Sequence, residues 1–313
     1  MSALIGLDWG TSNLRAMLMD GSGKVLESRS RPWGIRQLPD GGYAGALAAI
    51  TAGWPDLPRL AAGMVGSRNG WREVPYLNLP ATVGDVALAL HRGIDGASLA
   101  IVPGLRNPRG PDVMRGEETQ VIGLIATHQA LTATVVLPGT HSKWVSVRDG
   151  NMVDFRTMMT GELYGLLRQY SILGAGIATD TTAFDQPAFV DGVRSARDSG
   201  AAGALSRLFA TRARMLDGAL APASVPDYLS GLLIGEEFRA MRAAELLTTD
   251  APIWLIGDEA LCARYRLAAS EFSIIAAPAI HDTAAAGLWH LANAAGLLGS
   301  PLLNAFSVSG VRP

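Results

Sequence analysis

Short hydrophobic runs alternate with polar turns at the start of the chain. ALIGLDW (3–9), NLRAMLMD (13–20) and VLESRS (25–30) have the composition of β-strands. The polar turn Gly10–Ser12 separates the first two runs, and DGSGK (20–24) separates the second from the third. The pattern predicts a meander of three strands.

The same arrangement returns in the stretch TATVVLPGTHSKWVSVRDGNMVDFRT (132–157). Two pairs of turn residues recur at one constant offset of 129 residues: Gly10–Thr11 with Gly139–Thr140, and Asp20–Gly21 with Asp149–Gly150. Two turns at the same interval, each flanked by strand-like sequence, indicate a duplicated supersecondary unit. Chance is the alternative, because Gly-Thr and Asp-Gly are common dipeptides at turns.

Helical and strand patterns alternate through the rest of the chain. Helices are predicted over 41–54, 83–92, 117–128, 161–173, 199–216, 226–247, 258–270 and from about 281 to 295. Strands are predicted over 59–66, 98–104, 252–257 and 272–278. Each half is therefore predicted to be an α/β layer structure opened by a meander, with domains over 1–130 and 131–313. A cleft between the halves is the expected ligand site.

Composition narrows the classes of function. The 313 residues are 49% hydrophobic and 17% charged, which is typical of a globular protein long enough for two domains. A net charge of -2 without a basic run argues against a nucleic-acid partner. One cysteine, Cys262, cannot form an internal disulfide. Without a signal-like start or a membrane-length apolar run, we expect a cytoplasmic protein with no membrane partner.

The two polar turns have the composition of anion sites. Glycine allows close approach, and backbone N–H groups with Thr and Ser hydroxyls can bind phosphate. Asp8 ends the first strand, where a carboxylate can hold Mg²⁺ directly or through water. His141, Ser142 and Lys143 follow the second turn. The alternatives are plain structural turns and, for His141 and Lys143, a solvated edge.

Several other chemistries lack their signatures. The sequence has no G-x-x-x-x-G-K-[ST] loop and no G-x-G-x-x-G at the start of a helix, so P-loop and Rossmann sites are not expected. It has no H-E-x-x-H spacing and no G-x-S-x-G elbow, so neither a zinc enzyme nor a serine hydrolase is expected.

DWGTSNLR (8–15) resembles the first phosphate motif of the superfamily of acetate kinase, sugar kinases, heat-shock chaperones and actin. The second motif departs from that pattern, because Leu137 stands where an Asp is usual, and WLIGDEAL (254–261) has one glycine where the adenosine motif has two. The chain is more closely similar to the 2-dehydro-3-deoxygalactonokinase family. The stretches that carry this resemblance are DWGTSNLRA, AGMVGSRNGWREVPY, PDVMRGEETQ, LPGTHSKWV, TGELYGLL and YLSGLLIGEE.

The resemblance implies two ribonuclease H-like (actin-like ATPase) domains around an interdomain cleft, with the sugar acid on the N-terminal side. It implies ATP-dependent phosphorylation of 2-dehydro-3-deoxy-galactonate at its terminal hydroxyl, giving the 6-phosphate and ADP in galactonate catabolism, with Mg²⁺. The alternatives are a kinase for another small sugar or sugar acid and, further off, a nucleotide-switched binding protein. The oligomeric state is left open, with a homo-oligomer included.

The resemblance also implies roles for individual residues. Asp8 is the candidate Mg²⁺ ligand and catalytic group. The candidate catalytic bases are Glu118, Glu117 and Asp112. The candidate nucleotide-binding residues are Gly10, Thr11, Ser12, Asn13, Arg15, Gly139, Thr140, His141, Ser142, Lys143, Gly257 and Asp258. The candidate substrate-binding residues are Ser67, Arg68, Asn69, Trp71, Glu73, Tyr76 and Trp33, for which the alternative is a surface turn packed on aromatic rings.

Overall fold

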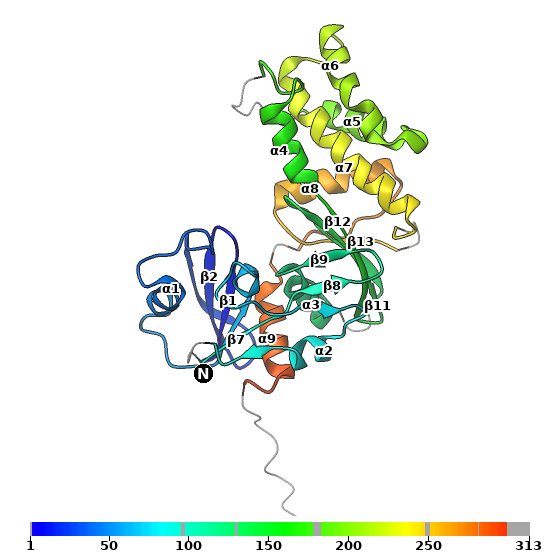
Figure 1. The fold of residues 1–313 in the computed structure, drawn as a ribbon. Helices are drawn as coiled ribbons and strands as arrows, with labels where there is room; N and C mark the ends of the chain where they lie inside the picture. The colour runs from blue at the N-terminus through cyan, green and yellow to red at the C-terminus, as the bar shows by residue number, and fades with distance from the viewer. Residues whose placement is uncertain are drawn as a thin grey trace, which may run out of the picture. The chain divides into compact units, whose positions relative to one another are not determined.

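A computed structural model describes residues 2–94, 98–128, 131–177, 183–247, 251–280 and 282–298 (Figure 1). Its contacts divide the chain into two compact units. Unit 1 contains the chain up to Arg106, the segment Met114–Thr127 and the segment from Thr283 onward. Unit 2 contains Asn107–Val113 and His128–Asp282.

Unit 1 is built on a six-stranded sheet with the order β3-β2-β1-β4-β7-β6. The first three strands pair antiparallel, which confirms the first predicted meander. Strand β4 is parallel to β1, β7 is parallel to β4, and β6 is antiparallel to β7 at the edge. The strands are β1 (Ser2–Trp9), β2 (Leu14–Asp20), β3 (Val25–Arg31), β4 (Arg59–Ala62), β6 (His91–Arg92) and β7 (Leu99–Ile101).

The central strand β1 is buried on both faces, with Leu4, Ile5, Leu7 and Trp9 completely inaccessible to solvent. A strand between parallel and antiparallel neighbours needs such a continuous apolar run. In contrast, the edge strand β3 is largely exposed, and charged side chains alternate along it. The helices of unit 1 are α1 (Gly42–Ile50), α2 (Val83–Leu88), α3 (Glu117–Thr127) and α9 (Ala284–Ala294).

Unit 2 repeats the meander. Its sheet has the order β12-β11-β10-β13, with the first three strands antiparallel and β13 parallel to β10. The second predicted meander is therefore confirmed, and its strand order matches that of the first. The strands are β10 (Ala133–Leu137), β11 (Ser142–Arg148), β12 (Asn151–Met158) and β13 (Ile253–Leu255). A further sheet has the order β5-β8-β9, from β5 (Leu77–Asn78), β8 (Leu105–Asn107) and β9 (Asp112–Met114).

The prediction of a strand over 272–278 is wrong. Helix α8 (Glu259–Glu271) ends just before this segment, and a turn follows. Among the described residues, only isolated bridges join the segment and its continuation to the sheet, Ala276 with Ile253 and Ile280 with Ile256. Pro278 has no N–H with which to extend a ladder, so the apolar run passes along the sheet without forming a regular strand.

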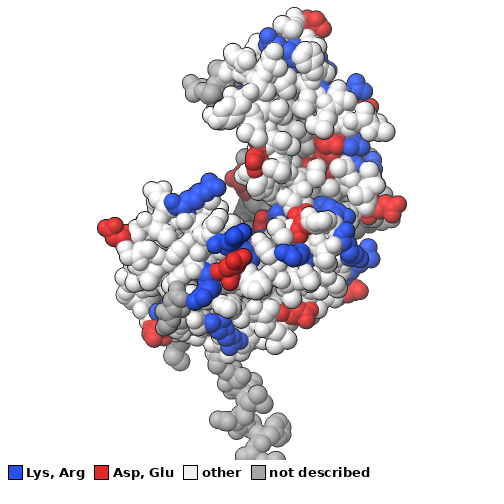
Figure 2. All heavy atoms as spheres, in the orientation of Figure 1, with Lys and Arg blue, Asp and Glu red and all other residues white. Residues whose placement is uncertain are grey.

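The helices of unit 2 are α4 (Thr160–Tyr170), α5 (Gln186–Arg197), α6 (Leu208–Leu216), α7 (Val225–Ala243) and α8 (Glu259–Glu271). The single helix predicted over 199–216 is wrong, because the glycine-rich part forms two 3-10 turns before α6 begins. Helix α5 was not predicted, although Asp185 caps it by accepting from Ala188 N and Pro187 stands in its first turn. On the face shown in Figure 2, the α4 to α6 region carries few charges, in keeping with the exposed Leu166, Leu205 and Phe209.

Helix α9 joins unit 1, so the composition of the units differs from a single division near residue 130. It begins at Ala284, whereas the predicted start, His281, lies outside the described residues. Its small residues allow close packing on α3, since a Cβ on Gly287 would clash with the carbonyl oxygen of Thr119. Thr283 Oγ1 also donates to Gln120 O over 2.7 Å. Among the described residues, none of the helices is both long and apolar enough to span a membrane.

Candidate functional site

The β1–β2 turn places an acid at the end of a buried strand. Gly10 N donates to Asn13 O over 2.9 Å and closes the turn. Asp8 stands opposite Arg15 in the strand register, and Arg15 Nη2 lies 3.5 Å from Asp8 Oδ2. The Asp8 side chain is 41% exposed, so its carboxylate is still accessible to a ligand despite this contact.

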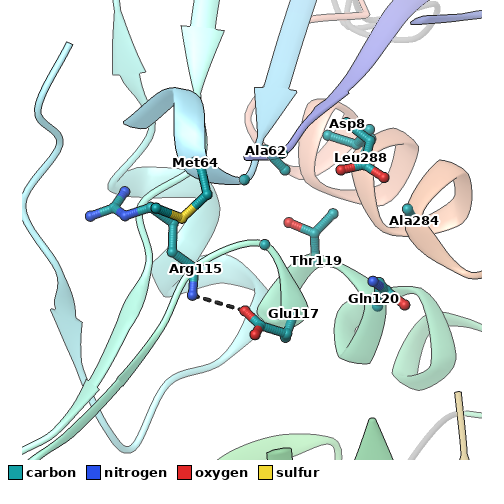
Figure 3. Close-up of a pocket in the computed structure, with 12 residues that line it drawn as sticks. Asp8, Ala62, Met64, Arg115, Glu117, Thr119, Gln120, Ala284 and Leu288 are labelled. Atoms are coloured by element: carbon teal, nitrogen blue, oxygen red, sulfur yellow. Dashed lines mark hydrogen bonds between the residues drawn. The ribbon is translucent and has the colours of Figure 1, made fainter. Parts of the chain in front are cut away.

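Asp8 and Gly10 line a cavity of about 170 Å³ that lies entirely within unit 1 (Figure 3). Its wall combines the end of β1, the segment after β4, the start of α3 and one face of α9. The other lining residues are Ala62, Gly63, Met64, Arg115, Gly116, Glu117, Thr119, Gln120, Ala284 and Leu288. Of the predicted site residues, this cavity brings together Asp8, Gly10 and Glu117.

The three candidate bases have different surroundings. Glu117 lines the cavity, and its Oε2 accepts from Arg115 N over 3.0 Å. Glu118 is completely buried and does not line the cavity, and its Oε2 accepts from Gly116 N over 2.7 Å. Burial, followed by the charge of Glu117, raises the pKa of Glu118 from its ordinary 4.5 to about 8.

Asp112 belongs to unit 2 and has a structural bonding pattern. Its Oδ2 accepts from Thr157 N over 2.6 Å, and its Oδ1 accepts from Thr157 Oγ1 over 2.7 Å. These bonds attach β9 to β12 within unit 2. Glu117 is therefore the one candidate base that lines the cavity containing Asp8.

The loop predicted to bind the substrate does not contribute to that cavity. Trp71 stacks on Tyr43 with ring centroids 5.6 Å apart and meets Trp9 edge-on at 6.0 Å. Trp33 packs on the same core, and its carbonyl oxygen accepts from Trp9 Nε1 over 2.8 Å. These tryptophans thus pack against the apolar core of unit 1.

The polar residues of the loop lie in two environments. Arg68, Asn69 and Glu73 are exposed. Ser67 is buried, and its Oγ has no hydrogen-bond partner among the described residues. The Tyr76 ring lies against the guanidinium group of Arg115.

The sequence reasoning missed Arg115, which lines the cavity and is 9% exposed. Its Nη2 donates to Val74 O over 2.7 Å, and its Cζ lies 4.3 Å from the centroid of the Tyr76 ring. In Figure 3 its guanidinium points away from Asp8 and Thr119. Arg115 thus supports the 64–76 loop from behind, which no local sequence pattern would reveal.

The Gly139–Thr140 turn of unit 2 lines a second, larger cavity of about 470 Å³. Helices α4, α7 and α8 form the other walls of this cavity. The remaining lining residues are Thr160, Gly161, Tyr164, Ser230, Leu233, Ile234, Leu261, Arg264 and Tyr265. The cavity lies entirely within unit 2, and its volume is in the range of sites for drug-sized ligands.

The residues after this turn have partners within unit 2 and do not line the cavity. His141 Nε2 lies 2.5 Å from Glu162 Oε2. Ser142 is completely buried, and its Oγ lies 2.8 Å from Tyr265 OH. Lys143 is also buried, and its Nζ donates to Thr157 Oγ1 over 2.7 Å. Ser142 and Lys143 therefore support the turn from within the protein.

Gly257 and Asp258 precede α8, and three residues of α8 line the second cavity. Asp258 caps α8, because its Oδ1 accepts from Leu261 N over 3.0 Å. Gly257 N donates to Ile280 O over 3.1 Å. Neither residue lines the cavity, so their effect on it runs through the position of the helix.

The model of the 2-keto-3-deoxy-galactonokinase family matches residues 8–291. The chain belongs to this family. A 2-dehydro-3-deoxygalactonokinase of Escherichia coli K12 is 38% identical to it over 295 residues, which cover 93% of this chain and 97% of that relative. A probable 2-dehydro-3-deoxygalactonokinase of Rhizobium meliloti is 38% identical over 270 residues, covering 84% of this galactonokinase-family chain and 87% of the relative.

Solved structures of other proteins share the fold of this chain. A crystal structure from Sinorhizobium meliloti, proposed to be a 2-dehydro-3-deoxygalactonokinase, has a TM-score of 0.84 and 36% identity, covering 96% of this kinase-family chain and all of that one. Component A of the (R)-2-hydroxyglutaryl-CoA dehydratase of Acidaminococcus fermentans has a TM-score of 0.50 and 14% identity, which concerns the fold alone. The predicted α/β fold with ribonuclease H-like halves is confirmed.

Proposed function

We propose that this chain transfers the γ-phosphoryl group of ATP to the terminal hydroxyl of 2-dehydro-3-deoxy-galactonate, giving the 6-phosphate and ADP in galactonate catabolism. The observation that carries the proposal is the family match over residues 8–291, together with 38% identity to the Escherichia coli kinase along 97% of its length. The enzyme is thus a 2-dehydro-3-deoxygalactonokinase. We further propose that it works in the cytoplasm and without nucleic acid.

The nucleotide is assigned to the cavity of about 470 Å³ in unit 2. Its wall offers the Gly139–Thr140 turn to phosphate oxygens and apolar and aromatic side chains, such as Leu233 and Tyr164, to the nucleoside. The other predicted nucleotide-binding residues, in both turns and before α8, stay part of the proposal.

Mg²⁺ is assigned to Asp8. Its accessible carboxylate beside a glycine turn suits a cation that keeps several waters and takes one or two carboxylates plus substrate phosphates. Within the described ranges no three His, Cys, Asp or Glu side chains come together as a metal cage. Bound to Asp8, Mg²⁺ would neutralise charge on the phosphates. Asp8 would hold the ion at the end of β1.

The sugar acid is assigned to the cavity of unit 1, with Glu117 as the group that accepts the hydroxyl proton. Glu117 is preferred because it lines this cavity, whereas Glu118 is sealed in the protein and Asp112 is bonded to Thr157. Thr119 and Gln120 supply hydrogen-bonding groups to the same cavity. The loop residues predicted from the family resemblance, from Ser67 to Tyr76 and Trp33, remain substrate-binding proposals.

A coupled assay with ATP tests the function. The panel contains 2-dehydro-3-deoxy-galactonate, its gluco epimer, other aldonates and neutral sugars. The expected result is the highest kcat/KM on the galacto acid. Best turnover on a neutral sugar would refute the acid specificity, and ATP hydrolysis independent of every substrate would favour a nucleotide-switched binding protein.

A further inference from the structure

A carboxylate lies completely buried beneath the nucleotide cavity of unit 2. Glu237, on α7, accepts from Trp144 Nε1 over 2.6 Å and from Tyr265 OH over 2.7 Å. Burial raises the pKa of Glu237, while hydrogen bonds from Thr160, Trp144 and Tyr265 oppose that change. Ser142 is a fourth such donor. All four donors are neutral, so within the described part of the chain hydrogen bonds and not an ion pair hold the carboxylate.

The hydrogen bonds of this carboxylate continue to the Gly139–Thr140 turn, which is the turn assigned to the phosphates. Tyr265 OH lies 2.8 Å from Ser142 Oγ, and Gly139 N lies 3.4 Å from the same oxygen. Ser142 Oγ also lies 3.5 Å from Gly139 O, so its hydroxyl can either accept from the N–H or donate to the carbonyl of Gly139. The direction of the chain of bonds decides between the two.

That direction follows from Glu237. Tyr265 OH donates to Glu237 Oε1, so its single O–H is directed toward Glu237. The Tyr265 oxygen then accepts from Ser142, which leaves Ser142 with lone pairs only for Gly139 N–H. The chain of bonds therefore runs from Gly139 N–H through Ser142 and Tyr265 to Glu237.

We propose that Glu237 is a positioning residue that orients the Gly139–Thr140 turn for the phosphates of ATP through Tyr265 and Ser142. The proposal rests on the assignment of the nucleotide to this cavity. Glu237 also joins the elements that form the cavity wall, because its partners Tyr265 and Thr160 line it from α8 and α4. The first turn of α4 packs directly on the phosphate turn, since a Cβ on Gly161 would lie 2.6 Å from Gly139 O.

Glu237→Gln reverses the chain without changing its shape. Trp144 Nε1–H can only donate, so it retains the amide oxygen and turns the amide NH₂ toward Tyr265. Tyr265 then donates to Ser142, and Ser142 donates to Gly139 O. Removing the indole N–H with Trp144→Phe frees the amide to rotate and restores the original direction.

Calorimetric binding of a non-hydrolysable ATP analogue with Mg²⁺ tests the proposal, beside the KM for the sugar acid and the melting temperature. We expect Kd to rise about tenfold in E237Q, as for one misdirected hydrogen bond in a binding turn, with an unchanged KM for the sugar acid. The double variant E237Q/W144F should regain at least about threefold of that affinity although it melts lower than E237Q. A purely structural role predicts the opposite, a double variant weaker in both measurements.

Two milder variants keep the test open if E237Q fails to fold. Tyr265→Phe and Ser142→Ala each break the chain and should also weaken the analogue about tenfold. The matched control is Tyr228→Phe. It removes a buried hydroxyl from α7 that takes no part in the hydrogen bonds between Glu237, Tyr265 and Ser142, and it should leave Kd unchanged. Affinities of Y265F and S142A within twofold of the native value would overturn the proposal.

The failure of the proposed function gives a different result. If the native chain binds the analogue but phosphorylates another sugar, the substrate assignment fails and the role of Glu237 stands. If the native chain binds no ATP analogue, both proposals are overturned.

Discussion

Replacing Glu118 with Gln should stabilise the protein at high pH and not at low pH. The folded pKa of about 8 lies above the ordinary 4.5 of the unfolded chain, so the folded state favours the protonated acid. The protonated carboxyl of Glu118 makes its full contribution to the free energy of unfolding below pH 4.5. This contribution is lost as the pH rises toward 8. A difference of about 3.5 in pKa corresponds to about 5 kcal/mol above pH 8, and to about 3 kcal/mol at pH 7.

Gln suits this site, because its oxygen can accept from Gly116 N and its NH₂ can donate to Thr119 Oγ1. Urea unfolding of native protein and E118Q at pH 4.5, 6, 7 and 8.5 measures the difference. It should be close to zero at the first pH and grow to several kcal/mol at the last. The exposed matched variant Glu73→Gln should show no such gain. A difference for E118Q that stays constant across this range would refute the reasoning.

Four further outcomes are expected. Asp8→Asn should lower kcat about 100-fold or more in the coupled assay with an unchanged melting temperature, since it removes the proposed Mg²⁺ ligand. Glu117→Gln should lower kcat by about 10²- to 10⁴-fold while calorimetry shows unchanged binding of the ATP analogue, and an unchanged kcat would exclude it as the base. Asp258→Ala should lower the free energy of unfolding by about 1 kcal/mol in urea through the lost cap of α8. Gly287→Ala should cost about 1–3 kcal/mol in the same measurement, because α9 must move away from α3.

The meanders were predictable because their signals are local. A strand of alternating or continuous apolar residues ends at a Gly-Thr or Asp-Gly turn, and both copies carry these residues at the same places. The helix break near Gly203 and the irregular segment around Ala276 also carry local signals, in Gly200, Gly203 and Pro278, but the prediction followed the apolar pattern instead. Their apolar residues have the right composition, but the surrounding packing and a proline decide the backbone.

Only the part of the candidate site that depends on local sequence was predictable. Asp8 and Gly10 belong to a turn motif, and Glu117 begins a helix, so the sequence alone could nominate them. The burial of Glu118 and the placement of Arg115 behind the 64–76 loop depend on contacts between distant segments. Adjacent glutamates in one sequence run therefore have opposite surroundings, which residue type cannot distinguish.

Helix α9 has a consequence for how this protein is made. Unit 1 starts with the first strand of the chain, yet the helix that packs on α3 follows Asp282, the last residue of unit 2. During synthesis on the ribosome, the part of unit 1 up to α3 therefore lacks the helix that covers α3 until unit 2 has been translated. A premature stop after unit 2 would leave the first half without its covering helix and open to proteases and chaperones, even though every residue of its sheet had been made.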